Sequence, residues 1–216
     1  MTRIVYYTAS TLNGFLADAD NSLAWLFAVD DAGGPDIAAF MDGMGVFVEG
    51  SATYEWVLRE ERLLENPAKW QQFYGAKPTY VFTSRELPVP AGADVRFVSG
   101  PVADALPGIV AAAGDKDVWV VGGGDVAGQF LDIDALDELV VTMAPAVLVG
   151  GAPLLPRTLG PDRMKLLSAG KHGQFAQLTY GVKKAGLGVP TAGPASGPAR
   201  SSAPAQASAP ARADRP

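Results

Sequence analysis

The chain has 216 residues, of which 48% are hydrophobic and 9% aromatic, and this is enough apolar material for one well-buried core. It contains no cysteine and a single histidine, His172, which excludes disulfides, a thiol nucleophile, and metal sites built from thiolates or from several histidines. The formal net charge is −6, and residues 186–216 carry three arginines against one aspartate, so residues 1–185 carry −8, which argues against a nucleic-acid surface.

The first predicted strand covers Arg3–Thr8, where β-branched and aromatic residues dominate, and a turn follows at Asn13-Gly14. A helix is predicted to begin at Gly34-Pro35-Asp36 and to run through Phe40. Proline is tolerated at the first helical position and an acidic residue suits the first turn. A second short strand is predicted over Gly45–Val48.

Helices are then predicted over Ser51–Leu58 and Glu60–Phe73, the second interrupted or kinked at Asn66-Pro67. Two short apolar strands follow, Thr79–Thr83 and Ala93–Val98. We expect the next helix, 101–113, to be kinked or divided by its internal Pro107.

The strand Asp117–Val121 leads through three glycines into a predicted helix over Val126–Leu131. The remaining predicted strands are Glu138–Met143, Met164–Ser168 and Phe175–Val182, of which the last two suit an antiparallel pair, with His172 exposed near a strand end. Strands that alternate with helices predict an α/β fold, with a largely parallel sheet covered on both faces.

Residues 186–216 consist largely of alanine and proline, so they bury too little apolar surface to fold, and we expect this tail to be disordered beside a folded domain of residues 1–185. The N-terminal segment MTRIVYYTAS lacks the basic stretch and long apolar core of a signal peptide. No apolar run reaches the length of a membrane span, which leads us to expect a cytoplasmic protein.

The most informative stretch is VWVVGGGDVAG, residues 118–128, in which a predicted buried strand is followed directly by Gly122, Gly123 and Gly124. Glycine lets the backbone turn sharply and approach a ligand closely, and the N–H groups of the following helix favour an anion such as a cofactor pyrophosphate. Two structural alternatives stand beside this interpretation. The glycines only make a tight strand-to-helix turn, or the carboxylate of Asp125 caps the helix itself.

Small, hydroxyl-bearing or glycine residues also follow other predicted strands, at the carboxyl edge where open α/β sheets bind ligands. These segments are Ser10–Phe15, Glu49–Tyr54 and Thr83–Arg85. Hydroxyl and amide groups with one arginine suit a long ligand rich in phosphate. Each segment also has a structural alternative, namely a reversal at Asn13-Gly14, a helix N-cap at Ser51, and a turn that leaves Arg85 in solvent.

Taken together, these ordered segments resemble the dihydrofolate reductase-like superfamily, and within it the reductase domain of riboflavin biosynthesis, the RibD C-terminal domain-like family. The resemblance covers roughly residues 1–184. The segments that carry it are Ser10–Ala17, Gly50–Glu55, Val81–Ser84, Val120–Gly124 and Ala144–Leu155.

The resemblance implies a three-layer α/β/α reductase that uses NADPH and passes a hydride to a small heterocyclic, carbonyl or imine substrate, pterin- or pyrimidine-like. It also implies a homodimer formed through the C-terminal strands. The implied cofactor contacts are Ala9, Asn13 and Gly14 at the nicotinamide, Gly50, Ser51 and Thr53 at the phosphates, Thr83, Ser84 and Arg85 at the adenosine ribose, and Gly122, Gly123, Gly124, Asp125 and Val126 at the pyrophosphate.

Two positions depart from the family pattern. Relatives often carry Asp where this chain has Asn13, and a basic residue where it has Ser51, which leaves the choice between NADPH and NADH open with Arg85 as the remaining candidate for the ribose phosphate. Asp36 is the nearest candidate for the acidic residue of a folate-reducing enzyme, and it suits helix capping equally well.

Asp18, Trp25 and Tyr54 are candidate substrate contacts, and no catalytic acid is assigned. Two other classes remain open. Gly122, Gly124 and Ala127 match the spacing of a dinucleotide-binding fingerprint, although this motif belongs after the first strand of its unit. A non-catalytic module that keeps the fold and binds a nucleotide is the alternative to an enzyme.

Overall fold

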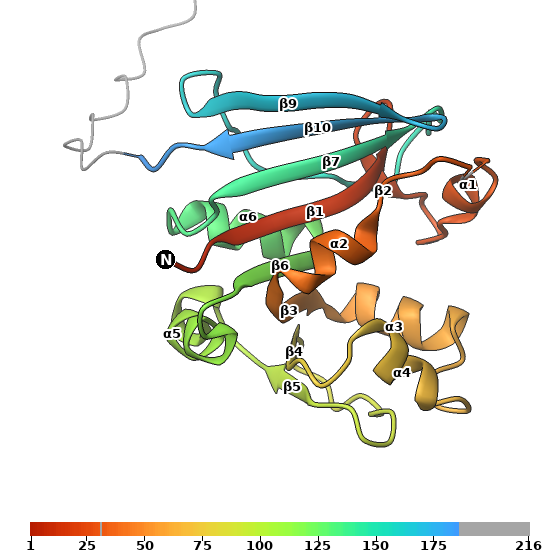
Figure 1. Ribbon diagram of the computed structural model, residues 1–216, viewed down its shortest axis with the longest axis vertical. Helices are drawn as coiled ribbons and strands as arrows, with labels where there is room; N and C mark the ends of the chain where they lie inside the picture. The colour runs from red at the N-terminus through yellow and green to blue at the C-terminus, as the bar shows by residue number, and fades with distance from the viewer. Residues whose placement is uncertain (31, 186–216) are drawn as a thin grey trace, which may run out of the picture. The chain divides into compact units, whose positions relative to one another are not determined.

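The computed structural model describes residues 1–30 and 32–185 (Figure 1). The tail 186–216, for which disorder is expected, lies outside the described residues. The strands are β1 Ile4–Thr11, β2 Phe15–Ala17, β3 Met44–Gly50, β4 Thr79–Phe82, β5 Val95–Val98, β6 Asp117–Gly122, β7 Glu138–Ala144, β8 Ala152–Pro153, β9 Met164–His172 and β10 Phe175–Val182. The helices are α1 Ala24–Phe27, α2 Ile37–Asp42, α3 Ser51–Glu60, α4 Ala68–Phe73, α5 Val102–Ala113 and α6 Gly124–Asp132.

Eight strands form one sheet in the order β5-β4-β3-β6-β1-β7-β10-β9, and β2 pairs with β8 in a separate two-stranded sheet. The strands from β5 to β7 in this order run parallel, whereas β10 pairs antiparallel with both β7 and β9. The predicted α/β fold with a mostly parallel sheet and antiparallel C-terminal strands is therefore confirmed.

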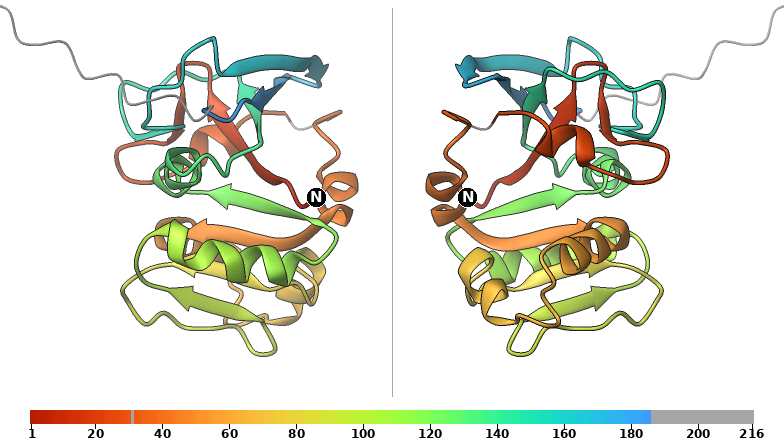
Figure 2. Two further views of the ribbon diagram at one scale, coloured as in Figure 1. Left: turned by 90° about the vertical axis from the view of Figure 1, so that its left-hand side faces the viewer. Right: turned by 90° about the vertical axis from the view of Figure 1, so that its right-hand side faces the viewer.

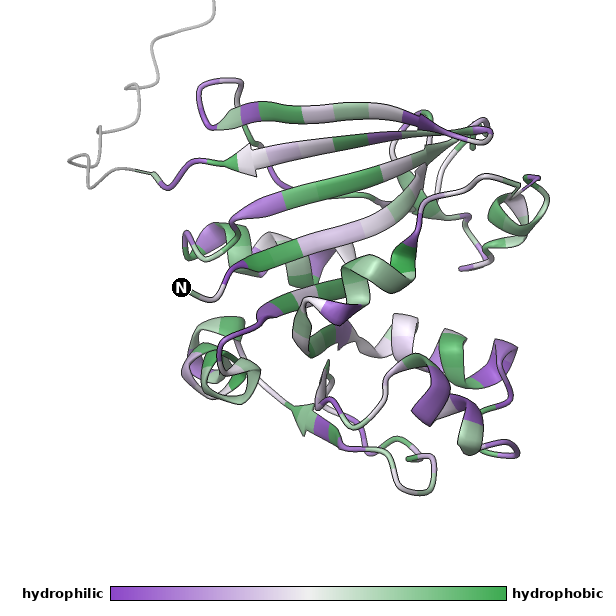
Figure 3. Cartoon of the chain, in the orientation of Figure 1, coloured by the Kyte–Doolittle hydropathy of each residue, from purple (hydrophilic) through white to green (hydrophobic). Residues whose placement is uncertain are grey.

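Helices cover both faces of the sheet (Figure 2). On one face, Ile4 and Tyr6 of β1 belong to a core cluster with residues of α5 and α6. On the other face, Val5 and Tyr7 belong to a cluster with residues of α3 and α4. Successive side chains of a strand point to opposite faces, so a strand buried on both sides reads as a continuous apolar run, which Figure 3 shows along β7.

Several elements differ from the sequence-based expectation. The short elements β2, α1 and β8 were not expected, because each has two to four residues and β2 and β8 depend on one another for pairing. The region 60–73 holds one short helix, α4, after a turn in which Arg62 has a φ of 49°.

Pro107 lies inside α5, which continues from Val102 to Ala113 without division. His172, expected to be exposed, ends β9 and is half-buried. Within residues 1–30 and 32–185, no helix combines the length and the apolar character that a membrane crossing requires.

Candidate functional site

Four neighbouring parallel strands, β4, β3, β6 and β1, end at one edge of the sheet. Their registers align these ends, since Gly50 pairs with Phe82 of β4 and Glu49 pairs with Gly122 of β6. The loops that carry Thr83, Ser51 and Gly123 therefore follow adjacent strands at the same edge. These distant segments thus share one edge of the sheet, and their joint contact with a single ligand stays a prediction.

A cavity of about 270 Å³, here called the triglycine cavity, lies at this edge. Its wall comes from β1, from β2 and β8, from the segment around α1, from α3, and from the end of β6 with the turn into α6. The lining residues are Thr8, Ala9, Leu16, Ala17, Asn21, Leu23, Leu26, Ala52, Thr53, Trp56, Val57, Val121, Gly122, Gly123, Gly124 and Ala152. None of these side chains is acidic or basic, so a ligand's phosphates would meet backbone N–H groups and hydroxyls there.

Each of the three glycines is required by the fold for a different reason. A Cβ on Gly122 would lie 2.6 Å from Oγ1 of Thr53, and a Cβ on Gly124 would collide with the carbonyl oxygens of Pro153 and Leu154. Gly123 has a φ of +92°, a conformation that side chains other than glycine adopt only with strain. The tight-turn interpretation thus accounts for the glycines structurally, and their role in ligand binding stays a prediction.

Two helix N-termini open at this edge. The N-cap of α3 is Gly50 and the N-cap of α6 is Gly123, and neither helix has a side-chain cap. A Cβ on Gly123 would lie 3.5 Å from the Gly50 nitrogen, so the two helix starts are adjacent. The first N–H groups of a helix have no intrahelical partner, and the helix dipole favours an anion beside them.

The two capping alternatives are not observed. Ser51 is the first residue of α3, which begins without a side-chain cap. The Asp125 carboxylate accepts hydrogen bonds from Gln129 Nε2 and Arg157 Nη2, each at 3.0 Å. These two bonds, with the positive charge of Arg157, hold the pKa of Asp125 below its ordinary value. The carboxylate at the start of α6 is thereby paired with a cation.

The loop after β4 forms a turn in which Thr83 Oγ1 accepts a hydrogen bond of 3.0 Å from the Arg85 N–H. The Arg85 guanidinium donates through both terminal nitrogens to the two carboxylate oxygens of Glu55 on α3, and this pairing raises the pKa of Arg85. Thr83, Ser84 and Arg85 do not line the triglycine cavity and follow the strand beyond β3. The candidate ribose-phosphate arginine is therefore held by a carboxylate.

The first turn contributes Ala9 to the cavity lining. Asn13 instead bridges two loops, because its Nδ2 donates to the Leu148 carbonyl at 2.6 Å while its Oδ1 accepts from Leu148 N–H and from Thr11 Oγ1. Gly14 has a φ of +84°, which allows the reversal between β1 and β2. Asn13 thus shapes the turn and is not itself part of the cavity wall.

The candidate substrate contacts have other positions than expected. The structure corrects the prediction that Tyr54 contacts the substrate, because this side chain is fully buried in the core and its hydroxyl donates to the Pro88 carbonyl at 2.7 Å. Asp18 accepts from the N–H groups of Asp20 and Ser22 and organises a turn. Trp25 is half-buried, and its indole N–H has no hydrogen-bond partner among the described residues.

Asp36 is the N-cap of α2, and its Oδ1 accepts from Ala38 and Ala39 N–H. The capping alternative is therefore observed for this residue.

Sequence reasoning missed most of the side chains that line the cavity, among them Trp56, Val57, Val121 and Leu23. Trp56 and Val57 lie three and four positions after Thr53 on α3, so the helical period places all three on one face. This spacing was the available signal. Leu23 precedes α1, an element with no sequence signal of its own.

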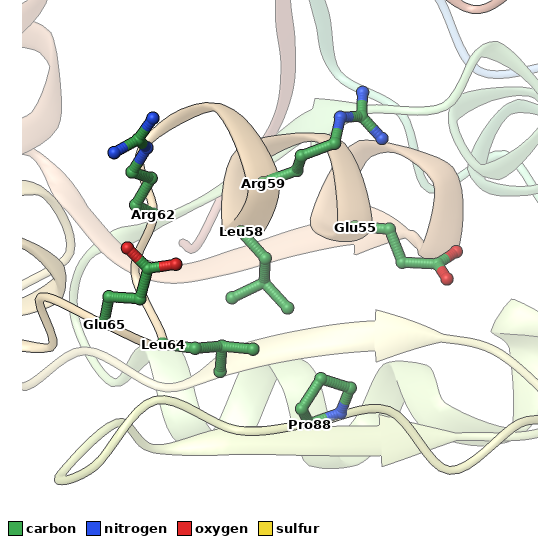
Figure 4. Close-up of a pocket in the computed structure, with 7 residues that line it drawn as sticks. All are labelled: Glu55, Leu58, Arg59, Arg62, Leu64, Glu65 and Pro88. Carbon is green, nitrogen blue, oxygen red and sulfur yellow. The ribbon is translucent and has the colours of Figure 1, made fainter.

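A larger cavity of about 650 Å³ lies elsewhere, and Figure 4 shows that it opens between α3, the loop after it and Pro88. Its lining residues are Glu55, Leu58, Arg59, Arg62, Leu64, Glu65 and Pro88. It shares no residue with the triglycine cavity, so volume alone does not identify the site.

Comparisons with known proteins show the family and the fold of this chain. The family model described as RibD C-terminal domain matches residues 3–178. YwjB of Bacillus subtilis (strain 168), a protein named as uncharacterised, is 28% identical over 178 residues, which are 82% of this chain and 97% of YwjB.

Two crystal structures share the fold. A protein from Shewanella sp. PV-4, named provisionally for riboflavin biosynthesis, matches with a TM-score of 0.67 and 28% identity over 85% of this chain and all of that chain. A deaminase and 5-amino-6-(5-phosphoribosylamino)uracil reductase from Thermotoga maritima matches with a TM-score of 0.57 and 18% identity over 84% of this chain and 56% of that chain.

Proposed function

The chain belongs to the RibD C-terminal domain family, and from this premise we propose that it is an NADPH-dependent reductase of a small heterocyclic, carbonyl or imine compound. One observation carries the proposal beyond family membership. The uncapped N-termini of α3 and α6 open side by side at one cavity that no acidic side chain lines. This arrangement suits the pyrophosphate of a dinucleotide.

The residues present fit such a cofactor. Gly123 carries no side chain at the start of α6, so a phosphate oxygen can approach the backbone there, while Thr53 adds a hydroxyl. Ala9 and Val121 belong to the same lining, near the ends of β1 and β6, and we assign the nicotinamide ring to them. When bound, the reduced nicotinamide supplies the hydride.

The remaining chemistry is positioning. Because no titratable side chain lines the triglycine cavity, we assign proton delivery to water. The chain's own contribution is to hold the nicotinamide and the acceptor carbon in contact and to exclude bulk water with apolar residues such as Trp56 and Leu26.

The choice between NADPH and NADH depends on Arg85, the basic side chain in the loop after β4. In this proposal the 2′-phosphate of NADPH exchanges with the Glu55 carboxylate on the Arg85 guanidinium. The pair lies at the surface, with side-chain exposures of 56% and 36%, so a doubly charged phosphate competes for the guanidinium at little cost in stability.

The proposal is tested first by titrating the protein with NADPH and with NADH while nicotinamide fluorescence is recorded. We expect saturable binding of at least one of them, and failure of both to bind would refute the reductase. Turnover is then followed at the nicotinamide absorbance band with pterins, pyrimidines, imines and carbonyl compounds. Binding without any turnover would favour the non-catalytic nucleotide-binding module.

We further propose a cytoplasmic homodimer. Leu166 and Leu167 on the edge strand β9 are 52% and 51% exposed, and a second copy covering this edge would bury them. Light scattering on the wild type and on a Leu166→Lys, Leu167→Lys variant tests this. We expect a dimer for the first and a monomer for the second.

A further inference from the structure

A second cavity of about 270 Å³ adjoins the triglycine cavity on the face of the sheet that α2, α3 and α4 cover; we call it the aromatic cavity. Trp56, Val57 and Val121 line both cavities, so the two lie side by side at the end of β6. The full lining of the aromatic cavity is Phe27, Ile37, Met41, Trp56, Val57, Glu61, Phe73, Tyr74, Trp119 and Val121.

Aromatic rings dominate its wall. Trp56 stacks on Phe27 with ring centroids 5.7 Å apart and an angle of 13° between the planes. Trp119 donates its indole N–H to the Tyr7 carbonyl at 2.9 Å, so this polar group is already satisfied within the protein. The wall thus offers flat apolar surfaces, which suit a planar ring.

The mouth of the aromatic cavity is apolar as well. Phe27, Ile37 and Phe73 are 69%, 42% and 49% exposed, although they come from three separate helices. A cluster of exposed large apolar side chains around a cavity marks a binding site for an apolar ligand. Its position beside the triglycine cavity points to a small molecule that meets the cofactor.

The charged side chains around the aromatic cavity disfavour an anionic ligand there. No lysine or arginine lines the aromatic cavity, and its one charged side chain is Glu61. Lys69 of α4 reaches the Glu61 carboxylate at 3.1 Å, and Lys77 donates to the Met41 carbonyl, but neither lysine belongs to the lining. A phosphate placed against these walls would lose its hydration without gaining a cation, which is strongly unfavourable.

We propose that the aromatic cavity binds the substrate, and that this substrate is a planar conjugated compound of one or two rings, neutral or cationic, and without a phosphate group. The inference rests on the proposed reductase function, whose substrate class it narrows. The size agrees, because a volume of about 270 Å³ lies near the small end of ligand pockets.

The reaction balances with the proposed cofactor alone. The hydride of the reduced nicotinamide forms a new C–H bond at the C=N or C=O carbon, and the π electrons move to nitrogen or oxygen. That atom takes a proton from water, and the cofactor leaves in its oxidised form. A cationic iminium already carries the required positive charge and takes no proton from water, and the Glu61 carboxylate in the cavity lining would favour this charge.

The test uses three bicyclic probes of one shape and different charge: N-methylquinolinium, quinoline and quinoline-6-carboxylate. Binding to the protein without cofactor is followed by quenching of tryptophan fluorescence, because Trp56 and Trp119 line the cavity. We expect the cation and the neutral probe to bind at least about tenfold more tightly than the carboxylate. Equal or tighter binding of the carboxylate would overturn the proposal.

Variants localise the binding. Trp56→Ala is expected to weaken all three probes, whereas Glu61→Gln is expected to remove only the advantage of the cation over quinoline. Glu60→Gln is the matched control, because Glu60 is the neighbouring acid, is exposed, and does not line the cavity. If Trp56→Ala leaves the quinoline affinity unchanged in a folded protein, the probes bind elsewhere and the assignment fails.

Different results would refute the reductase proposal and the aromatic-cavity proposal. Binding of NADPH without binding of quinoline or quinolinium would refute this inference and leave the reductase standing. Binding of the quinolines without either dinucleotide would refute the reductase and leave the aromatic cavity as a binding site. Because the cavities adjoin, saturating quinoline is expected to leave NADPH bound, and mutual displacement would contradict separate subsites.

Discussion

Gly123 and Gly50 meet at the carboxyl edge of the sheet, where a Cβ on Gly123 would lie 3.5 Å from the Gly50 nitrogen. This contact brings the starts of α3 and α6 together and defines the floor of the proposed pyrophosphate site. Any side chain at Gly123 would enter the space between the two helix starts. The first prediction follows from this relationship.

Gly123→Ala is expected to weaken NADPH binding at least about tenfold, because its methyl group displaces phosphate from the backbone N–H groups. The φ of +92° also makes the variant less stable by about 1 kcal/mol, and valine there would be strained further. Gly100→Ala controls for this strain, since Gly100 has a φ of +100° and open space around its Cβ position. Equal cofactor affinity in the two variants would contradict the phosphate assignment.

Glu55→Gln is expected to favour NADPH over NADH, because it frees the Arg85 guanidinium from its carboxylate partner. A free guanidinium gains a charge-assisted bond to the 2′-phosphate. This bond is expected to raise the ratio of the NADH dissociation constant to the NADPH dissociation constant about tenfold. Titrating both cofactors measures this ratio. Arg85→Ala is expected to lower it, and a ratio that neither variant changes would remove Arg85 from the cofactor site.

Glu49 is fully buried at the end of β3, and neither carboxylate oxygen has a hydrogen-bond partner among the described residues. Burial raises the pKa of Glu49 from 4.5 to about 8, so the folded protein holds a proton that the unfolded chain releases. The stability contributed by this proton is fully present below pH 4.5 and is lost as the pH rises toward 8.

Glu49→Gln is therefore expected to raise the free energy of unfolding at pH 8.5 by roughly 2 kcal/mol or more, and to change it little at pH 5. Urea unfolding at the two pH values measures this. Glu65→Gln, at an exposed position after α3, is the control and is expected to show no such difference. If the unfolding free energies of wild type and Glu49→Gln differ by the same amount at both pH values, the pKa of Glu49 is not raised in the folded protein.

Asn13→Asp is expected to destabilise the protein by about 1–2 kcal/mol, because a carboxylate cannot donate to the Leu148 carbonyl and is repelled by it. Thermal unfolding measures the loss. Asn66→Asp is the control, since the Asn66 amide is exposed and its bond to the Arg62 carbonyl is long, at 3.4 Å. An unchanged unfolding temperature for Asn13→Asp would mean that the two loops do not depend on this bridge.

Patterns along the chain predicted the central elements well, for a physical reason. The strands β1, β6 and β7 are runs of β-branched and aromatic residues buried on both faces, so their sequence alone distinguishes them. The alternation of these strands with helices then implies a parallel sheet, and a parallel sheet brings the loops after its strands to one edge.

Side-chain orientation was not predictable from those patterns. Tyr54 and Trp56 are two residues apart on α3, yet the first is buried in the core and the second lines both cavities. On a helix such neighbours point in nearly opposite directions, and only the packing of α3 on the sheet decides which of them faces inward. The sequence pattern therefore named Tyr54, whose side chain the structure buries.

The amino-acid sequence by itself determined the order of the elements, the shared edge of their loops and the triglycine turn, because these depend on local composition and period. Only the tertiary structure decided that Glu55 holds Arg85, that Asn13 ties two loops together, and that an aromatic cavity without basic residues adjoins the turn. Each of these relationships joins segments that are distant along the chain, and no local pattern records which distant side chains will meet.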